Sequence, residues 1–209
     1  ATNMVVEMTS LQGVMGREYA LINDYPQDVA DAIFEHWLPR NAGDRLPQSN
    51  AGALLGLADR LDSLVGLFAV GLAPKSTADP YGLRRAALGV IEVAVDKGIS
   101  ADLAKAVNLV ASAQPVSASI ESQTQVLEFI AGRLRVWMSE KGYAPDIISA
   151  VLAEQSRNPS QAIVGADELS KWVTHDNWES ILDSFARCVR ITRNEEARYQ
   201  VDPALLQQD

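Results

Sequence analysis

The chain has 209 residues, with 18 Lys or Arg against 27 Asp or Glu, so its formal net charge is −9. A hydrophobic share of 47% together with 22% charged residues excludes disordered, collagen-like and membrane-spanning classes and predicts a soluble globular chain of one or two domains. Its single cysteine, Cys188, cannot form an internal disulfide, which favours a reducing compartment.

Helical patterns recur along the chain, whereas strict alternation of apolar and polar residues is nearly absent, so we predict an all-α fold. The first clear helix follows Pro26 and ends by Pro39. Residues 40–48 are predicted to form a loop, after which Ser49 or Asn50 caps a long helix that we expect to be central and buried. Its predicted apolar stripe is Leu54, Leu57, Ala58, Leu61, Leu64, Val65 and Phe68.

Two further helices are predicted before residue 112. In the first, Asp79 is the expected N-cap and Pro80 the first helical residue, and Gly98 ends the helix. The residues expected to be buried in it are Leu83, Ala87, Val90, Ile91 and Ala94. Ser100 is predicted to cap the helix that follows.

A domain boundary is predicted near residue 112, because the composition of residues 112–122 shifts to Ser, Gln and Ala. We therefore expect one helical domain over residues 1–112 and a second helical region over residues 113–209. Helices are predicted in the second region over 123–141, over 145–155 and after Asn158-Pro159. A last amphipathic helix is expected to start at a capping box formed by Asp176 and Glu179.

No catalytic motif is present in the sequence. It lacks a Gly-x-Ser-x-Gly nucleophile motif, a phosphate-binding Gly-rich loop and a dinucleotide fingerprint. Only two histidines, His36 and His175, accompany the single cysteine, which argues against a structural zinc site. Asp59 and Asp62 lie three residues apart and form either a paired-carboxylate site or, our preferred interpretation, an ion-paired helix face. We predict no catalytic and no metal-binding residue.

Basic residues gather at one predicted helix start. Lys75 precedes this helix, and Arg84 and Arg85 lie in its first two turns. The free N–H groups and partial positive charge of a helix N-terminus favour anions, so this cluster could contact phosphate; pairing with acidic neighbours is the alternative. Because the whole chain is acidic, binding to nucleic acid must use such a local patch. Two further basic sets stay open: Arg133 and Arg135 beside Trp137, and Arg187, Arg190 and Arg193.

Several sequence blocks occur in order and are specific in combination. They include residues 2–20 (TNMVVEMTSLQGVMGREYA), 57–62 (LADRLD), 79–90 (DPYGLRRAALGV) and 129–135 (FIAGRLR). Together they closely resemble the beta subunit of the bacterial-type, two-subunit glycyl-tRNA synthetase. The likeness is strongest over residues 2–98 and looser toward the C-terminal end.

This resemblance implies a helical domain similar to His-Asp phosphohydrolases over residues 1–112, followed by helices that lead to an anticodon-binding module beyond residue 209. It also implies that the alpha subunit activates glycine with ATP and Mg²⁺, while the beta subunit contacts tRNA. The metal-binding His-Asp pair of the phosphohydrolases is missing here, and only Asp59 or Asp62 could stand for the last acidic ligand. We therefore expect no metal and no cofactor in this chain.

The resemblance identifies an internal fragment of a glycine–tRNA ligase, inactive by itself, that supports ATP-dependent glycylation of tRNA(Gly) by contacting acceptor-side phosphates. The expected tRNA-binding residues are Arg84, Arg85, Lys75, Arg60 and Arg40. The expected partners are tRNA(Gly) and the alpha subunit, with no membrane and no DNA. We expect a bacterial cytoplasmic location, or alternatively a plant chloroplast or mitochondrion. A structural spacer between the alpha subunit and the anticodon module, or a metal-dependent phosphohydrolase, are the other functions considered.

Overall fold

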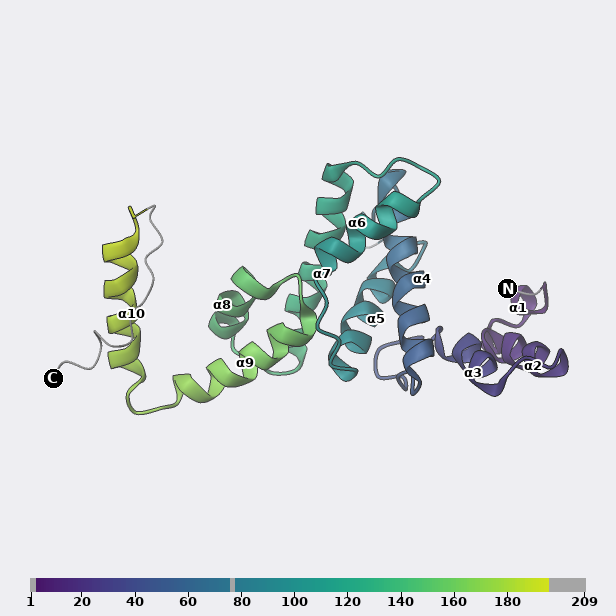
Figure 1. Ribbon diagram of the computed structural model, residues 1–209, viewed down its shortest axis with the longest axis horizontal. Coiled ribbons are helices and arrows are strands. Elements are labelled where there is room, and N and C mark those ends of the chain that lie inside the picture. The colour runs from purple at the N-terminus through teal and green to yellow at the C-terminus, as the bar shows by residue number, and fades with distance from the viewer. Residues whose placement is uncertain (1–2, 76–77, 196–209) are drawn as a thin grey trace. The chain divides into compact units, whose positions relative to one another are not determined.

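The computed structural model describes residues 3–75 and 78–195 (Figure 1). In these ranges the regular elements are helices and no residue belongs to a β-strand, so the predicted all-α fold is confirmed. None of the helices described combines the length and apolar character that crossing a bilayer demands. The chain forms two compact units, Ala1–Glu168 and Leu169–Asp209.

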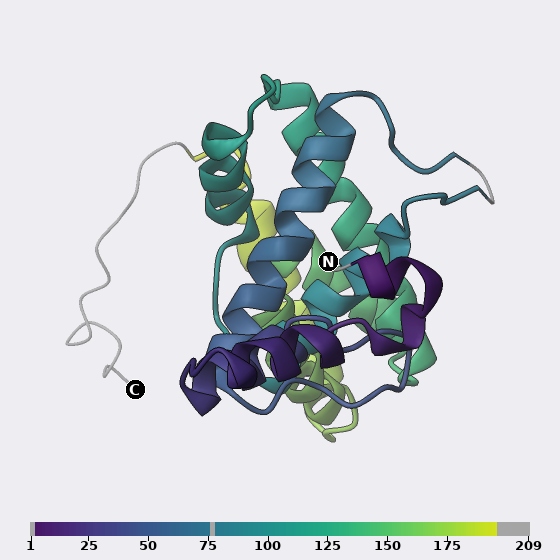
Figure 2. The ribbon, with the colours of Figure 1, turned by 90° about the vertical axis from the view of Figure 1, so that its right-hand side faces the viewer.

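The first unit is built around the helix α4. Its elements are α1 (Asn3–Glu7), the 3-10 turn η1 (Thr9–Leu11), α2 (Val14–Ile22), α3 (Gln27–Glu35), α4 (Asn50–Ala69), α5 (Leu83–Asp96), α6 (Leu103–Ala113), α7 (Ile120–Glu140), α8 (Pro145–Gln155) and most of α9 (Pro159–Val173). The helices α3, α5, α6 and α7 all pack against α4, and α3 crosses near its start (Figure 2). The long helix is therefore central, as predicted.

The predicted buried stripe is confirmed in the second half of α4, but in the first half the buried face is rotated from it. Its buried large apolar residues are Leu61, Leu64, Val65 and Phe68. The predicted core residue Leu54 is instead 59% exposed, whereas Gly52 and Gly56 are buried. A Cβ atom on Gly52 would lie 2.5 Å from the Cβ of Glu35, and one on Gly56 would lie 2.8 Å from the carbonyl oxygen of His36. The first half of α4 thus presents glycine to α3, because a larger side chain would not fit there.

The start of α5 differs from the prediction, although its core does not. The residues predicted to be buried, Leu83, Ala87, Val90, Ile91 and Ala94, are all 5% exposed or less. The helix begins at Leu83 rather than Pro80, because Asp79 to Gly82 form a turn in which Gly82 takes the left-handed conformation (φ 68°). Asp79 still acts as a cap, since its carboxylate accepts hydrogen bonds from the N–H groups of Leu83 and Arg84 at 2.8 and 2.9 Å.

The later helices of the first unit follow the prediction with two corrections. The predicted helices over 123–141 and 145–155 correspond to α7 and α8. The cap of α6 is Asp102 and not Ser100, because the Asp102 carboxylate accepts the N–H of Ala104 at 2.9 Å. The boundary expected near residue 112 falls inside the first unit, where α7 packs against α4, α5 and α6.

The second unit contains the end of α9 and the helix α10 (Trp178–Thr192). The residue at the N-cap of α10 is Asn177, which makes no side-chain capping bond, so the predicted capping box of Asp176 and Glu179 is wrong. No residue of α10 is buried, and Phe185 on its apolar face is 65% exposed. Residues 196–209 of the predicted second domain lie outside the part of the chain that the structure describes.

Candidate nucleic-acid interface

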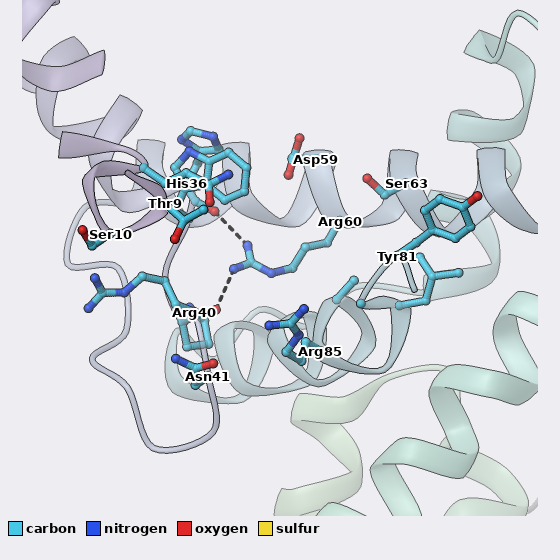
Figure 3. A pocket seen from close by; sticks show the side chains of 16 residues that line it. Thr9, Ser10, His36, Arg40, Asn41, Asp59, Arg60, Ser63, Tyr81 and Arg85 are labelled. Carbon is cyan, nitrogen blue, oxygen red and sulfur yellow. Dashed lines mark hydrogen bonds between the residues drawn. The ribbon is translucent and has the colours of Figure 1, made fainter. Parts of the chain in front are cut away.

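An open cleft of about 530 Å³ lies in the first unit, among α4, the start of α5 and the segment after α3 (Figure 3). Three arginines and one carboxylate are the charged side chains that line it: Arg40, Arg60, Arg85 and Asp59. Figure 3 shows Asp59 on one side, Arg40 and Arg85 on the opposite side, and Arg60 between them. This local excess of positive charge contrasts with the formal net charge of −9.

Arg60 is 8% exposed, and backbone carbonyls bind its guanidinium. Its Nη1 donates to the carbonyl oxygens of His36 and Gly56, both at 2.9 Å. Its Nη2 donates to those of Leu38 and Pro39 at 2.8 and 3.2 Å. These bonds tie the segment after α3 to α4. Because both terminal nitrogens already have acceptors, we assign Arg60 to the structure of the cleft wall and not to a phosphate contact.

Two glycines make room for the Arg60 side chain. A Cβ atom on Gly56 would lie 2.7 Å from its Nη1, and one on Gly89 of α5 would lie 2.3 Å from its Nε. Burial lowers the pKa of Arg60, while the charges of Asp59 and Glu92 act in the opposite direction. A guanidinium stays protonated in proteins, so Arg60 carries a buried positive charge whose contacts are mostly carbonyl dipoles.

Arg40 lies at the rim of the cleft and forms an ion pair with Asp44. Its Nε and Nη2 donate to the two carboxylate oxygens at 2.8 and 3.2 Å, and its side chain is 45% exposed. The hydrogen bond from Arg40 holds the pKa of Asp44 well below its usual range. Part of the Arg40 charge is therefore offset within the chain, although the side chain remains accessible.

Arg85 is exposed, and no hydrogen bond or ion pair engages its guanidinium within residues 3–75 and 78–195. It lies in the first turn of α5, where its side chain passes close to Gly82. A guanidinium binds phosphate with parallel N–H bonds, and one without a carboxylate partner need not break an existing pair to do so. Arg85 is therefore the side chain in the cleft best placed to bind an anion.

The structure does not bring Arg84 and Lys75 into the lining of this cleft. Arg84 is half-buried, and successive residues of a helix point about 100° apart, so it diverges from Arg85. Lys75 is exposed in the loop before α5. The Asp79 carboxylate already accepts the N–H groups of Leu83 and Arg84, so these two amides of α5 are not open to a phosphate.

His36 and Asp59 also line the cleft, but the residues present do not fit a metal centre. The Nδ1 of His36 lies 2.6 Å from the carbonyl oxygen of Ile33. Asp62, one turn along α4, accepts a hydrogen bond from Gln114 at 2.6 Å and does not pair with Asp59 in a shared site. Among the residues with described positions, no three His, Cys, Asp or Glu side chains gather as metal ligands. We assign no metal-dependent hydrolytic step to the cleft.

In each of the two other basic sets, at least one arginine already makes a side-chain contact within the chain. Arg135 donates to the hydroxyl of Ser149 at 3.1 Å, and Trp137 is half-buried. In the second unit Arg187 forms an ion pair with Asp183 at 2.7 Å. These contacts make both sets weaker candidates for binding RNA than the cleft.

Comparison with known proteins assigns the family. The family model described as glycyl-tRNA synthetase beta subunit matches residues 1–153. The chain belongs to this family. A glycine–tRNA ligase beta subunit from Aliivibrio salmonicida (strain LFI1238) is 40% identical over all of this chain and 30% of its own length. The beta subunit from Syntrophus aciditrophicus (strain SB) is 39% identical over 98% of this chain and 30% of its own length.

A plant protein is also similar. The chloroplastic/mitochondrial glycine–tRNA ligase 2 of Arabidopsis thaliana is 37% identical over 97% of this chain and 19% of its own length. The chain therefore spans between 19% and 30% of these relatives. The resemblance stated from the sequence blocks is confirmed at the level of the family.

The blocks that carried the resemblance supply most of the cleft. Ser10 comes from the block over residues 2–20, Asp59 from 57–62, and Tyr81 with Arg85 from 79–90. Sequence reasoning missed Ser10 and Tyr81 as site residues. Both residues belong to blocks that resemble the family, which could have pointed to them. Only the fold shows that these blocks line the same cleft.

Proposed function

We propose that this chain is a tRNA-contacting accessory region of a bacterial-type glycyl-tRNA synthetase, which helps to hold tRNA(Gly) while glycine is attached elsewhere in the enzyme. One observation carries the proposal: Arg85, exposed and unpaired within the described part of the chain, lines an open cleft together with Arg40. Contacts from arginine to phosphate position an RNA without reading its bases. Lys75 and Arg84 then act outside the cleft, as supplementary charges.

In this proposal the chain supplies no reacting group. The alpha subunit is its protein partner and activates glycine with ATP and Mg²⁺, so the chain itself needs no cofactor. Its place of action is the bacterial cytoplasm, or a plant organelle for a relative such as the Arabidopsis protein. We further propose that residues 1–112 have the helical fold of a His-Asp phosphohydrolase with a degenerate site, on the strength of the all-helical core and of His36 and Asp59 in the cleft.

The charge of the chain limits how tightly this region can bind alone. At a net charge of −9 the molecule repels a polyanion at long range, whereas the cleft offers a local excess of positive charge. Release of counterions from RNA makes such binding fall steeply with salt. We therefore expect weak and salt-sensitive binding, which adds to tRNA contacts made by the rest of the enzyme.

The test is aminoacylation at limiting tRNA(Gly) by the complete synthetase that contains this chain. We expect the double variant Arg84→Ala, Arg85→Ala to lower the rate at least several-fold through a higher KM for tRNA, with helix content unchanged by circular dichroism. Arg157→Ala is the matched control, because Arg157 is exposed and lies outside the cleft lining. An unchanged rate in the double variant would contradict the proposal.

A structural spacer is the second candidate, and one observation favours it: two of the three cleft arginines, Arg40 and Arg60, already have partners inside the chain. A spacer would tolerate reversal of the charges at the start of α5. A gel shift of tRNA(Gly) by the complete synthetase carrying Arg84→Glu, Arg85→Glu separates the two functions, because loss of a tRNA contact weakens the shift, whereas a spacer leaves it unchanged.

A further inference from the structure

The cleft contains an aromatic ring and a carboxylate in addition to its arginines. Tyr81, in the turn before α5, is 54% exposed and lines the cleft at one end (Figure 3). Asp59 and Ser63 lie along the α4 side. A ligand that is only an anion would use Arg85 but would be repelled by Asp59. The arrangement suits a ligand that carries a phosphate, a flat ring and hydrogen-bond donors.

The two accessible arginines do not converge on one point. In Figure 3 the guanidinium of Arg40 points away from Arg85, in keeping with its ion pair to Asp44. One phosphate would therefore meet only one of them as they stand. A strand with successive phosphates can reach both, which favours a nucleotide within a chain over a free nucleotide.

We propose that this cleft binds an unpaired nucleotide of the RNA, an inference that rests on the proposed function. Its phosphate binds Arg85, its base stacks on the ring of Tyr81, and Asp59 accepts a hydrogen bond from a base amino group or a ribose hydroxyl. A neighbouring phosphate of the same strand lies near Arg40. A cavity of about 530 Å³ has room for a single nucleotide.

The ring of Tyr81 distinguishes an unpaired strand from a duplex. Bases in a duplex are stacked on each other, so their faces are closed to an aromatic side chain, whereas unpaired bases can be splayed out and stacked on one. Contacts to a duplex would need only the phosphates. The hydroxyl groups of Ser63 and Ser10, which also line the cleft, can bond either kind of RNA and do not decide between them.

The experiment measures binding of the 209-residue chain to two labelled RNAs by fluorescence anisotropy at low salt. One RNA is a short unpaired strand, and the other is a hairpin duplex with the same number of phosphates. We expect Tyr81→Ala to weaken binding of the unpaired strand by about 5- to 140-fold, the range for loss of one stacked base. We expect less than about a two-fold effect on the duplex, because its bases make no such stack.

Two control variants keep the test specific. Tyr81→Phe preserves the ring and should retain binding. Tyr25→Ala removes a tyrosine that is 58% exposed and lies outside the cleft lining, and it should change nothing. Competition by AMP tests whether the cleft instead binds a free nucleotide. We expect AMP to displace the unpaired strand only at millimolar concentration. Displacement by micromolar AMP would overturn the inference in favour of a free nucleotide.

The outcomes also separate this inference from the proposed function. If Arg85→Ala weakens both RNAs while Tyr81→Ala affects neither, or affects both alike, the nucleotide inference is overturned and the phosphate contact stands. If Arg85→Ala leaves the affinity for both RNAs unchanged, the proposed function fails, and the nucleotide inference fails with it.

Discussion

The helices α5 and α10 have the same kind of sequence pattern but different surroundings. Each repeats apolar residues on one face at helical spacing. In α5 that face is closed off from water, with Ile91 at 0% exposure, because α4 and α7 pack against it. In α10 the equivalent face stays open, with Leu182 at 50% and Phe185 at 65% exposure.

The difference shows what apolar periodicity predicts and what it leaves open. It predicts that a helix forms and which residues share a face. It does not predict whether another part of the described chain covers that face. Stability should therefore depend on α5 and its neighbours far more than on α10, and matched substitutions in the two places test this.

The largest difference is expected between two isoleucines. Ile91→Ala should lower the free energy of unfolding by about 2–5 kcal/mol, because it leaves a cavity in a closed core. Ile191→Ala, at a residue that is 77% exposed in α10, should change it by less than about 0.5 kcal/mol. Urea denaturation followed by circular dichroism measures both. Equal effects would show that α10 is as well packed as α5.

Two arginines give the next comparison. Arg60→Met should cost about 2–3 kcal/mol of stability, because it removes charged donors from buried carbonyl groups, including that of Leu38. Lysine in its place should recover less than half of the loss, since one ammonium cannot reproduce the guanidinium fork. Arg187→Met removes an exposed ion pair on α10 and should have no measurable effect on the denaturation midpoint. A comparable loss in Arg187→Met would contradict the contrast.

Two glutamates, Glu35 in the first unit and Glu179 in α10, extend the comparison to the dependence of stability on pH. Glu35 is 9% exposed and accepts hydrogen bonds from the N–H groups of Ser49 and Gln48 at 2.8 and 3.0 Å and from the Ser49 hydroxyl. Burial acts to raise the pKa of Glu35, but these hydrogen bonds outweigh it and leave the pKa below 4.5. The folded state therefore holds the proton less tightly than the unfolded chain. The resulting stability is present above about pH 4.5 and is lost as the pH falls through the folded pKa.

We expect Glu35→Gln to lower the free energy of unfolding by about 1–2 kcal/mol at pH 7 and by less near pH 3. Glu179→Gln, at an exposed residue in the first turn of α10, is the control and should change the free energy of unfolding at pH 7 by less than about 0.5 kcal/mol. Urea midpoints measured from pH 3 to pH 7 provide the check. If Glu35→Gln lowered the free energy of unfolding by the same amount at every pH in this range, the stabilising role assigned to the ionised carboxylate would be contradicted.

The part of the fold that rests on local pattern was predictable. The core of α5 and the extent of α8 follow from spacing, proline and glycine in their own sequences. The rotation of the buried face in the first half of α4 was not predictable. It depends on the close approach of Gly52 to Glu35, which lies on another helix. Ser100 was predicted as the cap of α6, but the structure places Asp102 at that position.

The candidate site was predictable in part, for the same reason. Arg40 and Arg85 were expected to bind phosphate, and the fold brings both to one cleft. The burial of Arg60 was not predictable, since its acceptors at Leu38 and Pro39 lie more than 20 residues away in the chain. Tyr81 is close in sequence to Arg84 and Arg85, which were selected for their charge, but Tyr81 is uncharged and so was not selected.

The central claim is that the accessible guanidinium of Arg85 binds a phosphate of tRNA. The most direct measurement is the affinity of the chain for tRNA(Gly) as a function of salt concentration, for the wild type, Arg85→Ala and the control Arg157→Ala. We predict that Arg85→Ala lowers the affinity and reduces the slope of log K against log salt by about 0.7–0.9, the value for one lost phosphate contact. Arg157→Ala should change neither. An Arg85→Ala variant with the affinity and slope of the wild type would contradict the claim.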